Sequence, residues 1–267
     1  MWPMRRALGS PEPRSEDEEG MPARGLCPGL KRCARLAACI GLGFHSLAYY
    51  EEDTGREAYV EVEPGEPCRV TLLDPSGCVE DTLDALYRAL PMLVQAPLPS
   101  YELECREPVA EEGLRYRGLT LRLVSCIREH MVPCMKRLAV EPREYFAVLG
   151  WNGLYAVGPG SERAVTLPLI RSVVFGHTHP GPLCYPSWRD LRSFAEYFAS
   201  GGLVEVIVST NCAFVLRLVE PFAEDDYWAL QETARCAERA EKRGSGEDYM
   251  LCLNKLYGLR SVEAGML

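Results

Sequence analysis

Residues 175–190 read FGHTHPGPLCYPSWRD, and the chemistry and much of the fold that we expect for the chain follow from this stretch. His177 and His179 close an apolar run typical of a buried strand, and residues two apart on a strand face the same side. Two imidazoles on one side can bind a single metal ion. Apolar spacing predicts a helix over 186–198, with Asp190 in its first turn, where it can fold back over the strand end as a third ligand. Two histidines and one carboxylate leave a fourth tetrahedral position open, as in catalytic zinc sites.

A second interpretation of the same residues is purely structural. A His-x-His pair at a strand end is often only part of a polar edge. Ser187 and Asp190 also have the spacing of a capping box, with Ser187 as the N-cap and Asp190 three residues later. The two interpretations are compatible, because a capping serine can still present its hydroxyl group to a substrate.

The complete pattern is His-x-His-Pro, six residues, Ser, two residues and Asp, and it resembles the signature of the JAMM (MPN+) metalloproteases. The matching residues are His177, His179, Pro180, Ser187 and Asp190. The resemblance implies that the two histidines and the aspartate bind one zinc ion. It also implies that Ser187 is a catalytic residue that hydrogen-bonds the tetrahedral intermediate, and that a glutamate from an upstream strand is the general base.

The candidate for that glutamate is Glu144. Pro142 and Glu144 precede an apolar run that ends at Gly150, which is similar to the family's Pro-x-Glu, strand and glycine. Glu144 lies 33 residues before His177, and the nearest alternative is Glu141. We expect Glu144 to be the catalytic base, because a base must reach the water that attacks the substrate.

The resemblance covers about 115–220 and leaves three functions open. The first is a zinc-dependent isopeptidase that cleaves amide or isopeptide bonds at the C-terminus of ubiquitin-like proteins. The second is a peptidase that trims the C-terminus of a sulfur-carrier protein, and the third is a non-catalytic MPN scaffold. The stretch between Glu144 and His177 is short, which leaves little room for the substrate-gripping insertion of ubiquitin-specialised members.

The expected fold class is α+β with α/β-like layers, and the resemblance implies the cytidine-deaminase-like mixed sheet of the JAMM/MPN family, flanked by helices. We expect four segments: a disordered tail at 1–25, an N-terminal α+β module of unknown role at 26–112, the metalloprotease domain at 113–221 and C-terminal helices at 222–267. Within them we predict a helix over 29–40, a hairpin of strands 47–53 and 57–63 around Thr54-Gly55, and a helix over 119–139 kinked at Pro133.

Composition limits the partners. The chain has 267 residues and a formal charge of −9, which argues against a nucleic-acid-binding surface as its main feature. No apolar run approaches the length of a membrane span, so we expect no membrane partner and a cytoplasmic location. Homo-oligomerisation is compatible with the sequence. The chain has 25 Arg but only 4 Lys, 3 Asn and 2 Gln, and this depletion of amides indicates a hot habitat and an archaeal-type protein.

The 12 cysteines are scattered and contain no Cys-x-x-Cys pair, which disfavours a zinc ribbon. Such a set is typical of secreted or hyperthermophilic proteins with disulfides, although buried free thiols are an equally good explanation for any one residue. The best candidate for a bridge is Cys184 with Cys212, because Cys212 follows a strand, 203–209, that we expect beside the strand bearing His177.

Overall fold

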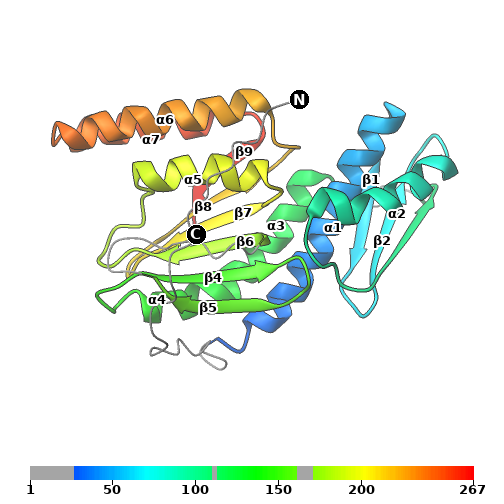
Figure 1. The fold of residues 1–267 in the computed structure, drawn as a ribbon, viewed down its shortest axis with the longest axis horizontal. Coiled ribbons are helices and arrows are strands. Elements are labelled where there is room, and N and C mark those ends of the chain that lie inside the picture. The colour runs from blue at the N-terminus through cyan, green and yellow to red at the C-terminus, as the bar shows by residue number, and fades with distance from the viewer. Residues whose placement is uncertain (1–26, 110–112, 161–170) are drawn as a thin grey trace, which may run out of the picture.

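The computed structural model describes residues 27–109, 113–160 and 171–267, and Figure 1 shows their arrangement. The predicted disordered tail therefore lies outside the described residues. The elements in chain order are α1 (Leu30–Thr54), β1 (Tyr59–Glu63), β2 (Cys68–Leu73), α2 (Glu80–Val94), β3 (Tyr101–Arg106), α3 (Tyr116–Cys126), the π-helical turn η1 (Ile127–Met131), α4 (Val132–Leu138), β4 (Tyr145–Gly150), β5 (Tyr155–Pro159), β6 (Ser172–Thr178), α5 (Trp188–Ala199), β7 (Val204–Val208), β8 (Ala213–Leu218), α6 (Glu224–Lys242), α7 (Gly246–Leu253), the 3-10 turn η2 (Asn254–Gly258) and β9 (Val262–Met266).

The predicted α+β class is confirmed, because the strands form two mixed sheets with helices packed around them. The larger sheet has six strands in the order β5-β4-β6-β7-β8-β9. β6 and β7 run parallel, and the other neighbours in this sheet are antiparallel. The smaller sheet has the order β1-β2-β3, with β2 and β3 parallel. β6 is therefore an interior strand that is supported on both sides.

Helices cover both faces of the larger sheet. In Figure 1, α5 lies on one face with α6 stacked on it, while α3 and α4 lie behind the sheet and α1 runs from there to the smaller sheet. Gly176 on β6 makes the rear packing close, because a Cβ atom there would lie 2.3 Å from Cε of Met131. On the front face, Tyr197 of α5 donates its hydroxyl hydrogen to the carbonyl oxygens of Ser172 and Val204 at 3.2 and 3.3 Å.

The predicted hairpin around Thr54-Gly55 is wrong in its first strand. Residues 47–53 continue α1, which runs for 25 residues, and only the second predicted strand forms, as β1. Leu47 and Tyr50, three residues apart, are both fully buried on one face of the helix, and this burial outweighs the turn signal at Thr54-Gly55 that predicted a hairpin. The Tyr50 hydroxyl also donates to a carboxylate oxygen of Asp74 at 2.8 Å. Gly55 ends the helix in the left-handed conformation, with φ 66°.

Two further differences concern the later helices. The predicted helix over 119–139 begins earlier, at Tyr116, and contains the π-helical turn η1, which ends two residues before Pro133. The segment 222–267 is not only helical, because β9 at its end pairs with β8 and completes the larger sheet. The sequence did not predict this strand, because Val262–Met266 has only five residues, too few for its apolar alternation to stand out.

All 12 cysteines are paired in disulfides, and the predicted bridge between Cys184 and Cys212 is confirmed. Within the described ranges, none of the helices combines the length and the apolar character that crossing a membrane requires.

Candidate metal centre

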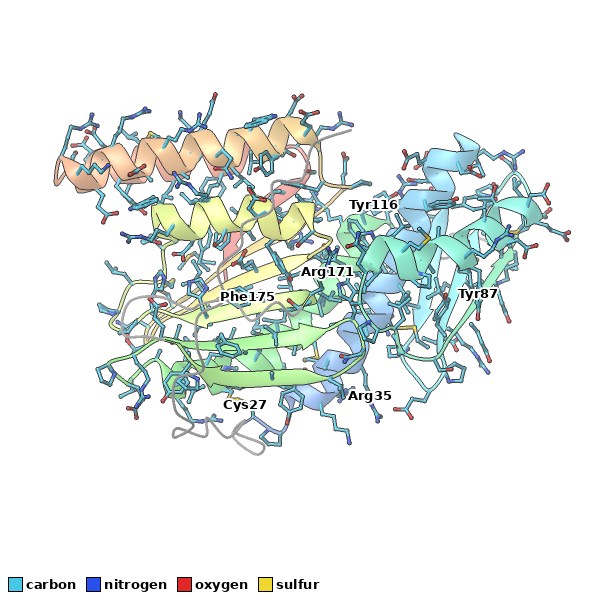
Figure 2. The ribbon with its side chains drawn as sticks, viewed as in Figure 1. Cys27, Arg35, Tyr87, Tyr116, Arg171 and Phe175 are labelled. Carbon is cyan, nitrogen blue, oxygen red and sulfur yellow. A yellow bond between two sulfur atoms is a disulfide. The ribbon has the colours of Figure 1, made fainter. Side chains whose placement is uncertain are left out.

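The two histidines of the predicted site lie at the end of the interior strand β6. His177 is the next-to-last residue of the strand and only 3% exposed. His179 follows the strand, and its backbone N–H donates to the carbonyl oxygen of Val208 at 2.9 Å, so the extended backbone continues beside β7. Phe175, labelled in Figure 2, stacks on the imidazole of His177 with ring centroids 5.7 Å apart. Burial and stacking hold the His177 ring in place.

The capping box predicted at the start of α5 is confirmed and orients the third side chain. Ser187 Oγ accepts a hydrogen bond from the backbone N–H of Asp190 at 3.2 Å. In return the backbone N–H of Ser187 donates to Oδ2 of Asp190 at 2.6 Å. The carboxylate of Asp190 is therefore turned back toward the end of β6.

The structure brings His177, His179 and Asp190 together in a geometry that fits a tetrahedral metal ion. The two Nε2 atoms are 3.2 Å apart, and they lie 3.3 and 3.2 Å from Oδ1 and Oδ2 of Asp190. Ligand atoms about 2.0–2.1 Å from zinc at tetrahedral angles are about 3.3–3.4 Å from one another. Each imidazole nitrogen thus lies at about this separation from the other nitrogen and from one carboxylate oxygen, Oδ1 for His177 and Oδ2 for His179.

The charges of these groups are strongly coupled. Burial disfavours the charged form of Asp190, but the adjacent His177 and His179 outweigh this effect and hold the pKa of the carboxyl well below its usual range. Burial lowers the pKa of His177, yet the negative charge of Asp190 and a hydrogen bond to it raise the pKa above its ordinary value overall. Without a cation the cluster therefore attracts a proton, which is the expected behaviour of a site built to hold positive charge.

Glu144 lies directly before β4, across from the histidines. β4 pairs with β6 so that Phe146 is opposite His177, and continuing this register places Glu144 opposite His179 on the same face of the sheet. Burial raises the pKa of the half-buried Glu144 carboxyl, which also senses the charges of the histidines and Asp190. Glu141, by contrast, is exposed in the turn after α4.

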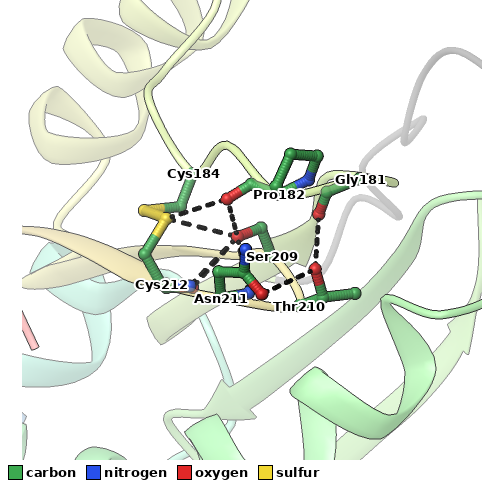
Figure 3. The surroundings of a disulfide bond; sticks show 7 residues. All are labelled: Gly181, Pro182, Cys184, Ser209, Thr210, Asn211 and Cys212. Carbon is green, nitrogen blue, oxygen red and sulfur yellow. Dashed lines mark hydrogen bonds between the residues drawn. A yellow bond between two sulfur atoms is a disulfide. The ribbon is translucent and has the colours of Figure 1, made fainter.

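The loop between the histidines and α5 is fastened to the sheet at several points. Figure 3 shows the disulfide of Cys184 and Cys212 beside two hydrogen bonds, in which the hydroxyls of Ser209 and Thr210 donate at 3.0 Å to the carbonyl oxygens of Pro182 and Gly181. These contacts tie the middle of the loop to the β7–β8 turn.

A further support comes from α7, where the hydroxyl of Tyr249 donates to the carbonyl oxygen of Pro186 at 2.7 Å. Pro186 directly precedes the capping serine. The first turn of α5, and with it the aspartate, is therefore held by a residue from the C-terminal part of the chain.

Glu205 and Tyr249 are neighbours of the site that sequence reasoning missed. Glu205 is 1% exposed on β7, and its Oε2 has no hydrogen-bond partner among the described residues. It is paired with Phe175 and therefore shares the face that carries His177, whose Nδ1 is also buried without a partner there. The sequence contains one signal for Glu205, because it is an acidic residue inside the apolar run 203–208. No local pattern indicates that Tyr249 lies near the site.

No family model, no curated protein and no solved structure matches the chain. What this site does therefore has to be inferred from its own side chains.

Proposed function

We propose that the chain is a zinc-dependent metallopeptidase of the JAMM (MPN+) type, which hydrolyses amide or isopeptide bonds at the C-terminus of ubiquitin-like proteins. The observation that carries this proposal is the separation of 3.2–3.3 Å between the two imidazole nitrogens and between each nitrogen and one oxygen of Asp190, beside a half-buried glutamate directly before the neighbouring strand. A structural ion pair alone would not account for two imidazole nitrogens directed at each other and at one carboxylate. The mixed sheet flanked by helices also supports the JAMM/MPN fold.

His177, His179 and Asp190 would hold the zinc ion. Zinc bound there would supply Lewis acidity, which lowers the pKa of a coordinated water and polarises a carbonyl group. Glu144 would take a proton from the attacking water at its carboxylate and later release it to the leaving amine nitrogen. Burial raises the pKa of Glu144 toward the working pH, which suits a group that must both accept and donate a proton.

Ser187 would stabilise the oxyanion of the tetrahedral intermediate. Its Oγ accepts the hydrogen bond of the capping box through a lone pair, so the hydroxyl hydrogen remains available as a donor. The disulfide-tied loop and α5 fix the position of this donor in advance, as electrostatic stabilisation of a transition state requires.

The loop also offers a contact surface for a protein substrate. Leu183 and Tyr185 are 66% and 38% exposed, and they lie between the histidines and the serine. Apolar and aromatic side chains of this kind are enriched where proteins bind one another. The ubiquitin-like substrate class itself comes from the resemblance of residues 177–190 to the JAMM signature.

The experiment is hydrolysis of a panel of ubiquitin-like and sulfur-carrier proteins that carry a C-terminal extension or an isopeptide-linked peptide, with products identified by mass spectrometry. We expect Glu144→Gln to keep its zinc but to lose activity on the order of 10²–10⁴-fold, because the amide is nearly isosteric and cannot accept the proton. Glu141→Gln is the matched control and should remain active.

Equal rates for wild type and Glu144→Gln would show that another residue is the base. Cleavage of linear extensions but not of isopeptides would favour the sulfur-carrier peptidase. A zinc-loaded protein that cleaves none of the panel would favour the scaffold.

A further inference from the structure

A second group of metal-ligating side chains lies between α1 and the segment from α3 to α4, which packs on the face of the larger sheet opposite the one that carries His177. Cys126, His130 and Cys134 are spaced four residues apart and so occupy one face of this segment. Cys27, which precedes α1, and Cys33, in its first turn, form the disulfides Cys27–Cys134 and Cys33–Cys126 with this segment. Cys27 is labelled in Figure 2 near the end of α1 that lies against the larger sheet. His130 lies beside the Cys33–Cys126 cystine.

The distances within this group are short. The sulfur atoms of Cys33 and Cys126 and a ring nitrogen of His130 all lie within 4.8 Å of one another. Gly29 allows this approach, because a Cβ atom there would lie 2.9 Å from Nδ1 of His130. The π-helical turn η1, Ile127–Met131, begins directly after Cys126 and contains His130, and such turns occur frequently at functional sites. The His130 side chain is 25% exposed, so an ion has access from solvent.

We propose that reduction of the Cys33–Cys126 disulfide converts this group into a second zinc site, with the two thiolates and the neutral His130 imidazole as ligands. A dithiol reductant would donate two electrons and two protons to the cystine and close to its own disulfide. Binding of Zn²⁺ would then form two Zn–S bonds and one Zn–N bond and release the two thiol protons to solvent. Two cysteines and one histidine are an established ligand set for zinc, with solvent in the fourth position.

The surrounding structure allows this change without a large rearrangement. Sulfur ligands about 2.3 Å from zinc are about 3.8 Å apart, and Cα atoms 5.8 Å apart leave that separation within reach of side-chain rotation. The Cys27–Cys134 disulfide joins the same two parts of the chain about two helical turns away, and where it stays oxidised it would keep them together while Cys33 and Cys126 bind the metal. The site would therefore be unable to bind zinc in the oxidised protein and able to bind it in the reduced one.

Cobalt is the probe that separates this site from the one at His177. Thiolate-bound Co²⁺ has an intense sulfur-to-cobalt absorption in the near ultraviolet, whereas the His177 site contains no sulfur. We expect the full chain, reduced with a phosphine under argon, to gain about one Co²⁺ per chain together with this absorption. Cys33→Ser/Cys126→Ser should lack the band. His130→Ala should bind about tenfold or more weakly.

Cys78→Ser/Cys105→Ser is the matched control, because it removes another disulfide that has no histidine beside it, and it should keep the band. No band in the reduced wild type, or an equal band in both double variants, would overturn the proposal. If full reduction unfolds the chain, Cys126→Ser tests the proposal without a reductant. This variant leaves Cys33 as a thiol, and the other five disulfides can remain closed. It should show a weaker single-sulfur band that disappears in Cys126→Ser/His130→Ala, and persistence of that band would also overturn the proposal.

Discussion

Removal of the Cys184–Cys212 disulfide should lower both the stability of the fold and the metal affinity of the His177 site. The bridge closes a ring of 29 residues, from 184 to 212. Loop-closure entropy for a ring of this size corresponds to about 3.6 kcal/mol at 25 °C. For a chain of this size, each kcal/mol shifts the melting temperature by about 2–4 °C, so Cys184→Ala/Cys212→Ala should melt about 7–14 °C lower.

The effect on metal binding shows whether this bridge positions the loop at the His177 site or only stabilises the fold as a whole. Cys78 and Cys105 close a ring of nearly the same size, 28 residues, beside the smaller sheet. Cys78→Ala/Cys105→Ala should therefore lose a similar free energy of unfolding, about 3.6 kcal/mol, and keep its metal affinity. Cys184→Ala/Cys212→Ala should bind zinc on the order of tenfold more weakly, because the loop that leads to Ser187 loses one of its attachments to the β7–β8 turn.

The assay is thermal unfolding by circular dichroism, together with competition for zinc against a chromophoric chelator. Equal losses of zinc affinity in the two double variants would refute the local role of the Cys184–Cys212 bridge. An unchanged melting temperature and zinc affinity in Cys184→Ala/Cys212→Ala would mean that the prolines of the loop, at 180, 182 and 186, are sufficient to hold it.

Three other outcomes follow from the site and the sheet. His177→Ala should reduce the zinc content of the oxidised protein from about one ion per chain to none, which elemental analysis will show, and retention of zinc would place the ion elsewhere. Burial, and after it the negative charge of Asp190, raises the pKa of Glu205 well above 4.5. The metal-free folded protein therefore keeps a proton that the unfolded chain releases. The contribution of this group to the free energy of unfolding is complete below pH 4.5, and above pH 4.5 it declines by up to about 1.4 kcal/mol per pH unit. Glu205→Gln should flatten that decline in thermal unfolding measured from pH 5 to 8. Parallel curves of stability against pH for wild type and Glu205→Gln would contradict the burial of this carboxyl. Gly176→Ala should cost about 1–3 kcal/mol by denaturant unfolding because its Cβ meets Met131, whereas Gly265→Ala on β9 meets nothing and should be nearly neutral.

Local patterns in the sequence were sufficient to predict the strand, loop and helix that carry the three candidate metal ligands. His177 and His179 share a face because strand residues alternate with period two, and the capping box depends only on residues three apart. These relations involve neighbours along the chain, so they do not depend on the rest of the fold. The same holds for the Cys184–Cys212 prediction, which needed only the expectation that two consecutive strands lie side by side.

Contacts between distant parts of the chain decided the rest. Glu144 lies opposite His179 because β4 pairs with β6 in one particular register across 33 residues, which no local pattern specifies. Residues 47–53 are helical because Leu47 and Tyr50 are buried against distant elements, and this burial overrides the hairpin signal of Thr54-Gly55. Glu205 and the Cys33–Cys126–His130 group likewise become visible only after folding, because burial and the meeting of two helices are properties of the packed chain and not of any short segment of it.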